Sequence, residues 1–155
     1  MTKNLWLFDI DGTLVNINDI HVASYRMLYS SILGVDVPER IILGTFGMSE
    51  QEMHKSVFNN LNIHYEVSIV NKLLQNRPQY FVKALDSKKI EPLGGVVEFL
   101  SYLKNNQEYL AAVTGNQKEP AEIIFEKANL KEFFSILSYD DDKSTRTQIL
   151  GRAID

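Results

Sequence analysis

The chain has 155 residues, no cysteine and a formal net charge of −4 at pH 7, and its composition is 45% hydrophobic and 23% charged. This length and composition favour a globular protein with one core, or one core with an inserted subdomain, over a disordered or membrane protein. The acidic balance argues against nucleic acid or an anionic membrane as partner, and the lack of cysteine excludes disulfides, thiolate metal sites and a cysteine nucleophile.

The N-terminal sequence MTKNLWLF contains no long apolar segment of the kind that a signal peptide requires. A chain without cysteine is also compatible with a reducing compartment. We therefore expect a cytoplasmic protein.

The first predicted element is a short strand, Leu5 to Phe8. Its continuous apolar run is typical of a parallel strand that is covered on both faces. Two carboxylates, Asp9 and Asp11, follow it at once, which crowds negative charge at the end of an apolar strand. We therefore expect a positive charge to bind there.

The next part of the chain predicts helices only. Apolar residues at helical spacing indicate a helix within 18–34, and Ser49 with Glu52 has the pattern of a capping box that begins another. A third helical stretch lies within 65–85, where Pro78 predicts a kink or a division.

We interpret the aromatic and histidine side chains of this helical part as structural rather than catalytic. His21, His54 and His64 have no metal-binding spacing, and we expect each at the surface or half-buried. The segment from Gly44 to Gly47 is expected to be a turn between helices. The aromatic residues expected to pack the interior are Tyr25, Tyr29, Tyr80 and Phe81.

Strands return in the last third of the chain and alternate with helices. A helix opens after Pro92, residues 110–113 read as a buried strand, Pro120 suits the first turn of another helix, and 134–137 is a candidate third strand. This alternation predicts a parallel α/β layer.

The predicted fold class is therefore α/β, with a Rossmann-like parallel sheet core and an inserted all-helical subdomain. The core comprises residues 1–16 plus 90–155, and residues 17–89 form the insertion.

Polar residues follow two of these strands, because Asp9–Ile10–Asp11–Gly12–Thr13 ends the first and Thr114–Gly115–Asn116 ends the next. Ligands of open parallel sheets bind at the carboxyl ends of the strands. Two segments 100 residues apart are thus expected to meet in one crevice.

These residues resemble a known family. FDIDGTLVN resembles the first signature of the haloacid dehalogenase superfamily, AAVTGN resembles the second, and the helical block resembles the helical cap of the superfamily. The general pattern is similar to the phosphoglycolate phosphatase-like members. An aspartate at Asp11 favours phosphatases, because the dehalogenases proper do not keep one there.

The resemblance implies roles for both carboxylates. Asp9 would be the nucleophile that forms an aspartyl phosphate, and Asp11 the acid and base that protonates the leaving alcohol and then activates water. Magnesium would bind the Asp9 carboxylate and the backbone carbonyl of Asp11.

The resemblance also implies how the phosphate is held. Backbone amides at Ile10 and Gly12 would bind phosphoryl oxygens together with the Thr114–Gly115–Asn116 segment, and Gly12 would let the chain turn beside the phosphate. The third signature is a basic residue, for which Arg146 is the first choice and Lys143 the second.

The fourth signature, an acidic pair after another strand, has no counterpart before the chain stops at Asp155. Asp140–Asp141–Asp142 precedes the basic residue, so a solvated turn is the simpler interpretation. The family's strand for this signature lies beside the first strand. Either the sequence is an incomplete version of a longer protein, or another chain covers the apolar edge of Leu5 to Phe8, which makes self-association possible.

The resemblance thus implies magnesium-dependent hydrolysis of a small phosphorylated metabolite. A sugar phosphomutase and a catalytically weak, phosphate-binding or regulatory relative remain the alternatives.

Overall fold

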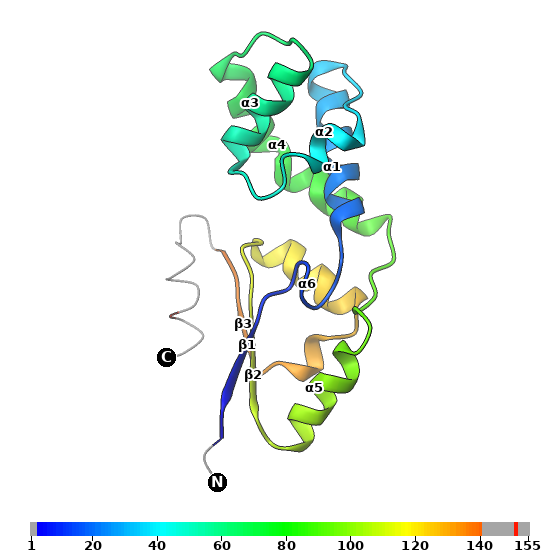
Figure 1. Ribbon diagram of the computed structural model, residues 1–155, viewed down its shortest axis with the longest axis vertical. Coiled ribbons are helices and arrows are strands. Elements are labelled where there is room, and N and C mark those ends of the chain that lie inside the picture. The colour runs from blue at the N-terminus through cyan, green and yellow to red at the C-terminus, as the bar shows by residue number, and fades with distance from the viewer. Residues whose placement is uncertain (1–2, 141–150, 152–155) are drawn as a thin grey trace. The chain divides into compact units, whose positions relative to one another are not determined.

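The computed structural model describes residues 3–140 and 151 of the chain. The chain divides into two compact units, which are drawn in Figure 1. The first, here called the sheet unit, comprises Met1–Ile17 and Lys89–Asp155. The second, the helical unit, comprises Asn18–Lys88.

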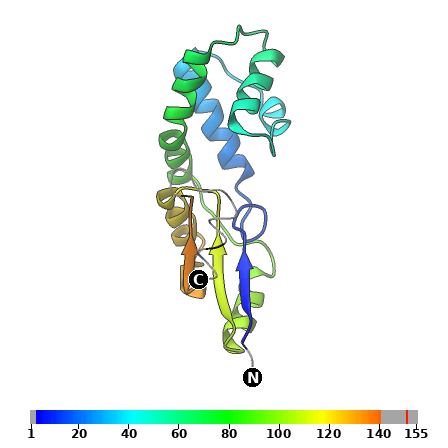
Figure 2. The ribbon, with the colours of Figure 1, turned by 90° about the vertical axis from the view of Figure 1, so that its left-hand side faces the viewer.

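The described residues of the sheet unit form a parallel sheet of three strands in the order β1-β2-β3. In Figure 2 the strands lie side by side with β2 in the middle. Their bounds are Leu5–Phe8 for β1, Tyr109–Val113 for β2 and Ile136–Ser138 for β3. In the parallel register, Leu5 of β1 lies opposite Tyr109 of β2, and Ala111 of β2 lies opposite Ile136 of β3. These pairings confirm the predicted parallel α/β fold.

Within residues 3–140 the sheet unit has three helical segments, and both ribbon views place the two α-helices among them on one face of the sheet. Phe99 of the first helix contacts Trp6 and Phe8 edge to face, with ring centroids 5.8 and 6.3 Å apart, respectively. Leu100 and Leu103 of the same helix are fully or almost fully buried. The segments are α5 (Val96–Asn105), α6 (Lys118–Lys127) and the 3₁₀-helix η1 (Lys131–Phe133).

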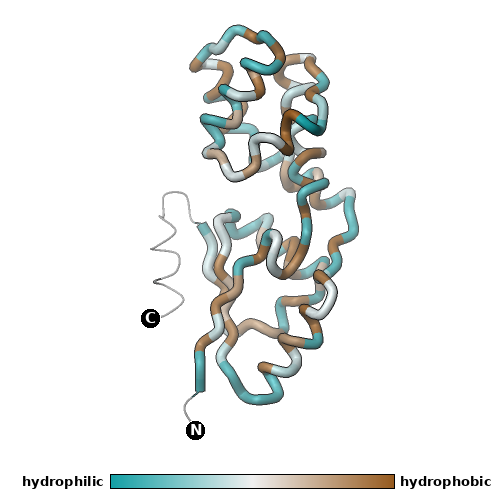
Figure 3. Tube along the Cα trace, viewed as in Figure 1, coloured by the Kyte–Doolittle hydropathy of each residue, from teal (hydrophilic) through white to brown (hydrophobic). Residues whose placement is uncertain are grey.

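Strand β1 lies at the edge of the described sheet. Figure 3 colours the chain by hydropathy and shows brown stretches along the strands, yet Leu5, Trp6 and Leu7 of β1 are 38%, 38% and 39% exposed. The expectation of a strand covered on both faces is therefore wrong for β1. The Tyr109 amide donates to the Asn4 carbonyl, so by the alternation of a parallel ladder the backbone groups of Leu5 and Leu7 point away from β2.

The third strand begins two residues later than predicted, at Ile136 rather than Phe134. Phe134 instead packs its ring against Phe8 and Phe125, with centroids 5.9 and 5.6 Å away. The 3₁₀-helix η1 ends at Phe133, and Phe134 is its C-cap, with its amide donating to the Lys131 carbonyl, so the strand pairing begins only after it.

Four helices form the helical unit, around a core to which Tyr29, Phe58 and Leu73 contribute fully buried side chains. Ser49 and Glu52 make the predicted capping box at the start of the third helix. Pro78 lies inside the last helix without dividing it, and the second helix was not predicted. The helices are α1 (Asn18–Leu33), α2 (Glu39–Leu43), α3 (Glu50–Asn60) and α4 (Val67–Asp86).

Burial in the helical unit differs from expectation at one histidine. His54 is fully buried, whereas His64 is exposed and His21 is half-buried. The expectation that His54 lies at the surface or half-buried is therefore wrong. Within residues 3–140 and 151, every helix is too short or too polar to span a bilayer.

Candidate active site

Asp9 follows the last residue of β1, and its side chain is exposed. Its Oδ1 accepts a hydrogen bond of 2.9 Å from the amide of Ile10. This bond orients the carboxylate at the carboxyl end of the strand, while the exposed position leaves it accessible to a ligand from solvent.

A tight turn follows, in which the Ile10 carbonyl accepts from the amides of Leu14 and Val15 at 2.9 and 3.2 Å. Gly12 has a φ of +76° and donates to the Val15 carbonyl at 2.8 Å. A Cβ at Gly12 would meet no atom within 4 Å, so the left-handed backbone, not space, requires glycine here.

Asp11 is half-buried, and its Oδ2 accepts a hydrogen bond of 3.0 Å from the side-chain amide of Asn116. The two residues are 105 positions apart in the sequence. The structure therefore brings the two predicted polar segments together at one end of the sheet.

Thr114 and Asn116 are fixed by β2 and its neighbour. The Thr114 amide donates to the Ser138 carbonyl of β3 at 3.0 Å, which extends the ladder by one residue. The Thr114 hydroxyl accepts from the Asn116 amide at 3.0 Å, and Thr114 is only 3% exposed. The hydroxyl oxygen thus occupies a defined place at the end of β2.

Asp140 also belongs to this end of the sheet, because its amide donates to the Asn116 carbonyl at 3.0 Å. Its Oδ1 is buried and has no hydrogen-bond partner among the described residues. Asp140 itself is half-buried, so its side chain is only partly solvated. Asp141 and Asp142 lie outside the described residues.

The predicted phosphate-binding amides differ in availability. The amides of Ile10 and Gly12 already donate to Asp9 and Val15, so phosphate binding by them would require those bonds to change. A side chain at Gly115 would meet no atom within 4 Å, which indicates open space beside this residue. The basic candidates Arg146 and Lys143 lie outside the described residues.

The donor set suits a hard divalent cation. Asp9 and Asp11 would supply oxygen ligands, and Mg²⁺ is usually held by one or two carboxylates, with water and substrate phosphate completing its shell. Among residues 3–140 and 151 there is no group of three or more acidic, histidine or cysteine side chains that could hold a metal ion. Asp9 and Asp11 therefore fit a divalent cation whose remaining ligands would be water and substrate.

Comparison with known families settles the relationship. The family model described as haloacid dehalogenase-like hydrolase matches residues 6–154. The chain belongs to this family. Hydrolases of the haloacid dehalogenase-like family generally use a divalent metal ion, in keeping with the oxygen ligands of the site.

Solved structures of this hydrolase family share the fold. A Clostridium difficile protein described as a candidate phosphatase superposes with a TM-score of 0.82 at 18% identity, covering 100% of this chain and 70% of its own. A Haemophilus somnus protein described as a predicted phosphoglycolate phosphatase superposes with a TM-score of 0.77 at 18% identity, and the match covers 92% of this chain and 64% of that protein. A candidate β-phosphoglucomutase from Thermotoga maritima superposes with a TM-score of 0.69 at 18% identity, and the match covers 99% of this chain and 72% of that protein.

A curated relative is similar over a shorter stretch. The candidate pyrophosphatase PpaX of Clostridium perfringens is 37% identical over 54 residues, which are 35% of this chain and 25% of that protein. The match thus spans a quarter of the length of that relative.

Proposed function

We propose that this hydrolase cleaves small phosphate monoesters through an aspartyl phosphate on Asp9, with magnesium as cofactor. In this proposal residues 1–16 and 90–155 form the catalytic core, and residues 17–89 form a helical cap that selects the substrate. The partner is a small phosphorylated metabolite.

The hydrogen bond between Asn116 and Asp11 carries the proposal. It fixes one oxygen of Asp11 beside the end of β2, two residues along the chain from the exposed Asp9. A nucleophile and a separate proton carrier are the two groups that a covalent phosphoryl transfer requires.

In the first step the Asp9 carboxylate attacks phosphorus, and the bond between phosphorus and the ester oxygen breaks. Asp11 gives its proton to that oxygen, which leaves as an alcohol. In the second step Asp11 takes a proton from water, and the water oxygen attacks the phosphorus of the aspartyl phosphate. Inorganic phosphate leaves, and the Asp9 carboxylate is restored.

The remaining groups at this end of the sheet would hold the phosphoryl oxygens. The Thr114 hydroxyl and the Gly115 amide are the described candidates, and the predicted basic residue is Arg146 or Lys143. Magnesium, bound by the Asp9 carboxylate and the Asp11 carbonyl, would offset the charge of Asp9 and the phosphate.

Phosphate release from an aryl phosphate, with and without magnesium, tests the proposal. We expect magnesium-dependent turnover that is lost in Asp9→Asn, which keeps the size of the side chain but removes the nucleophilic charge. Asp19→Asn is the matched control, because Asp19 pairs with Lys88 at 3.2 Å in the helical unit. Turnover that survives in Asp9→Asn would contradict the mechanism.

A phosphomutase is the second candidate, favoured by the structural likeness to the Thermotoga maritima protein. It would use the same aspartyl phosphate but transfer the phosphoryl group to a sugar hydroxyl. Product analysis with a sugar phosphate separates the two, because a hydrolase releases inorganic phosphate and a mutase returns an isomeric ester.

A further inference from the structure

Strand β1 forms one edge of the described sheet, where it is the blue strand of Figure 2. The backbone groups of Leu5 and Leu7 point away from β2, so the N–H and C=O of both residues face outward. These groups are unpaired within the part of the chain that the structure describes. An open edge of this kind is a template for a further strand, so the backbone itself specifies an extended partner.

The two faces of β1 carry different side chains. Trp6 and Phe8 point toward the helices, since both contact Phe99 of α5. Because side chains alternate along a strand, Leu5 and Leu7 point to the opposite face of the sheet. The described α-helices of the sheet unit lie on the first face only, which leaves both leucines exposed on the second.

Charged residues extend this pattern at both ends of the strand. Lys3 lies on the leucine face, since its Nζ is 5.3 Å from the ring centroid of Tyr109, which is opposite Leu5 in the register. Asp9 follows Leu7 by the same alternation, and both charged side chains are exposed. Along one face the open edge therefore carries a cation, two leucines and a carboxylate, in that order.

The start of the strand is held in place by its own chain. The Asn4 amide donates to Oε2 of Glu108 at 2.6 Å, and the Asn4 carbonyl accepts from the Tyr109 amide at 3.0 Å. These bonds fix the backbone next to Lys3. A preformed edge lowers the ordering cost of adding a strand.

The order of side chains along the edge is self-complementary. In an antiparallel pair about a two-fold axis at Trp6, Leu5 of one copy lies opposite Leu7 of the other. Lys3 then lies opposite Asp9, because both are equally far from the axis. An axis at Leu5 would instead place Lys3 opposite Leu7, and an axis at Leu7 would place Leu5 opposite Asp9. Apolar pairs and opposite charges across strands stabilise pairing, so the axis at Trp6 is favoured.

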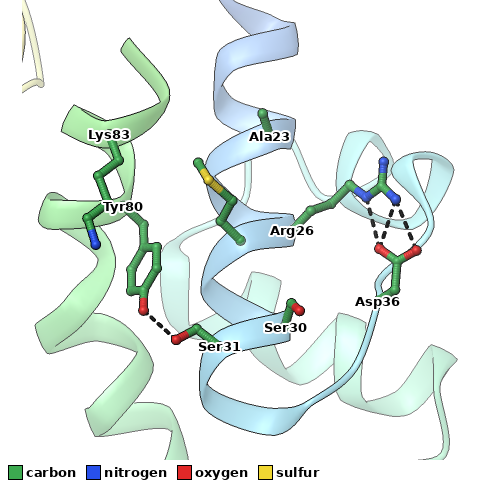
Figure 4. A pocket seen from close by; sticks show the side chains of 8 residues that line it. Ala23, Arg26, Ser30, Ser31, Asp36, Tyr80 and Lys83 are labelled. Atoms are coloured by element: carbon green, nitrogen blue, oxygen red, sulfur yellow. Dashed lines mark hydrogen bonds and ion pairs between the residues drawn. The ribbon is translucent and has the colours of Figure 1, made fainter. Parts of the chain in front are cut away.

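A hollow on the helical unit makes no such demand for a partner. Figure 4 shows Arg26 beside a hollow of about 610 Å³, where it makes hydrogen bonds of 2.8 to 3.0 Å to both oxygens of Asp36. In the same hollow Tyr80 donates to Ser31. These polar groups pair within their own chain, whereas the outward groups of β1 do not pair among the described residues.

We propose that a second copy of this chain docks on β1 as an antiparallel strand, about a two-fold axis at Trp6, so that Lys3 of each copy pairs with Asp9 of the other. The two sheets then join into one continuous sheet, on which Leu5 and Leu7 of both copies contact one another. The interface is isologous, because the same strand contributes to both sides. The charge pairs are exposed, so they select the register more than they add affinity.

Disulfide formation between single cysteines tests the register, since the chain has no cysteine of its own. Trp6→Cys places its sulfur at the two-fold axis, where the opposed Cα atoms are about 4.5 Å apart, within the range of a disulfide. Under mild oxidation we expect it to form a covalent dimer at least about tenfold faster than Ser30→Cys, an exposed control on α1. A rate no greater than that of the control would overturn the docking.

Leucine variants give a second measurement, because Trp6→Cys also removes packing against α5. A mixture of Leu5→Cys and Leu7→Cys should form a mixed disulfide faster than either protein forms one alone. Faster disulfide formation by Leu5→Cys alone would place the axis at Leu5, and by Leu7→Cys alone at Leu7. Either result would overturn the pairing of Lys3 with Asp9.

Sedimentation velocity tests the charge pairs without turnover, so its result does not depend on the proposed function. We expect Lys3→Asp to weaken the dimer about tenfold, because two repulsive pairs replace two attractive ones. Combining Lys3→Asp with Asp9→Lys should restore the dissociation constant. The control Lys131→Asp reverses an exposed charge that lies 3.7 Å from Glu126 and should leave the constant unchanged.

Three results would contradict the proposal in this assay. A wild-type chain that is monomeric at about 100 µM would overturn the docking itself. A dimer that Lys3→Asp leaves unchanged, or that the exchange of the two charges does not restore, would refute the pairing of Lys3 with Asp9.

Discussion

The buried His54 should make the stability of the protein depend on pH. Burial, with a smaller contribution from Arg77, lowers its pKa from an ordinary value of 6.5 to about 4. Below pH 6.5 the unfolded chain therefore binds a proton that the folded chain does not. Between about pH 7 and about pH 5 the folded state should lose about 2 kcal/mol from this group, and about 3 kcal/mol by pH 4.

Urea unfolding followed by far-ultraviolet circular dichroism measures this loss. His54→Asn retains an acceptor for the Tyr29 hydroxyl but cannot be protonated, so its free energy of unfolding should fall less than that of the wild type between the two pH values. His64→Asn, which changes an exposed histidine, is the matched control and should keep the wild-type pH dependence. If wild type and His54→Asn lose the same free energy, His54 is not the buried neutral group described here.

Three further predictions concern the sheet unit. Asn116→Ala removes the hydrogen bond that orients Asp11 and should lower kcat in a phosphatase assay about tenfold. An unchanged kcat and pH profile would contradict a role of Asn116 in positioning Asp11. Gly12→Ala should destabilise the protein by about 1 kcal/mol in urea unfolding, because its φ of +76° strains other residues; no change would mean that the turn relaxes. We expect self-association through β1, and Leu7→Lys should shift size-exclusion elution toward the monomer; an unshifted profile in a self-associating wild type would exclude this edge.

The sequence predicted the features that depend on local pattern and on simple topology. Apolar strands followed by Asp9 and by Thr114 imply a shared crevice, because parallel strands end on the same side of a sheet. The bond between Asp11 and Asn116 is the observation that this reasoning anticipates.

Burial of polar side chains in the helical unit was not predicted, although the spacing contained a signal. Arg77 lies four residues from both Leu73 and Phe81, and all three are buried on α4. His54 likewise precedes the buried Val57 and Phe58 by three and four residues. From the sequence alone a charged residue on an apolar helix face is easily assigned to the solvent side. Only the packing of α1 and α3 against α4 shows that Arg77 is buried.

The chain enters and leaves the helical unit at adjacent points. Lys88 and Asp19, at its two ends, are joined by an ion pair of 3.2 Å. In the sheet unit the flanking segments are also joined, since the Leu93 amide donates to the Leu14 carbonyl at 2.8 Å and Val15 pairs with Pro92. The two ends of the insertion are thus tied to each other, and so are the segments that flank it. An exchange of residues 18–88 for another helical segment with neighbouring ends would leave the strand connections intact, and under the proposed function it would change the substrate range without altering Asp9.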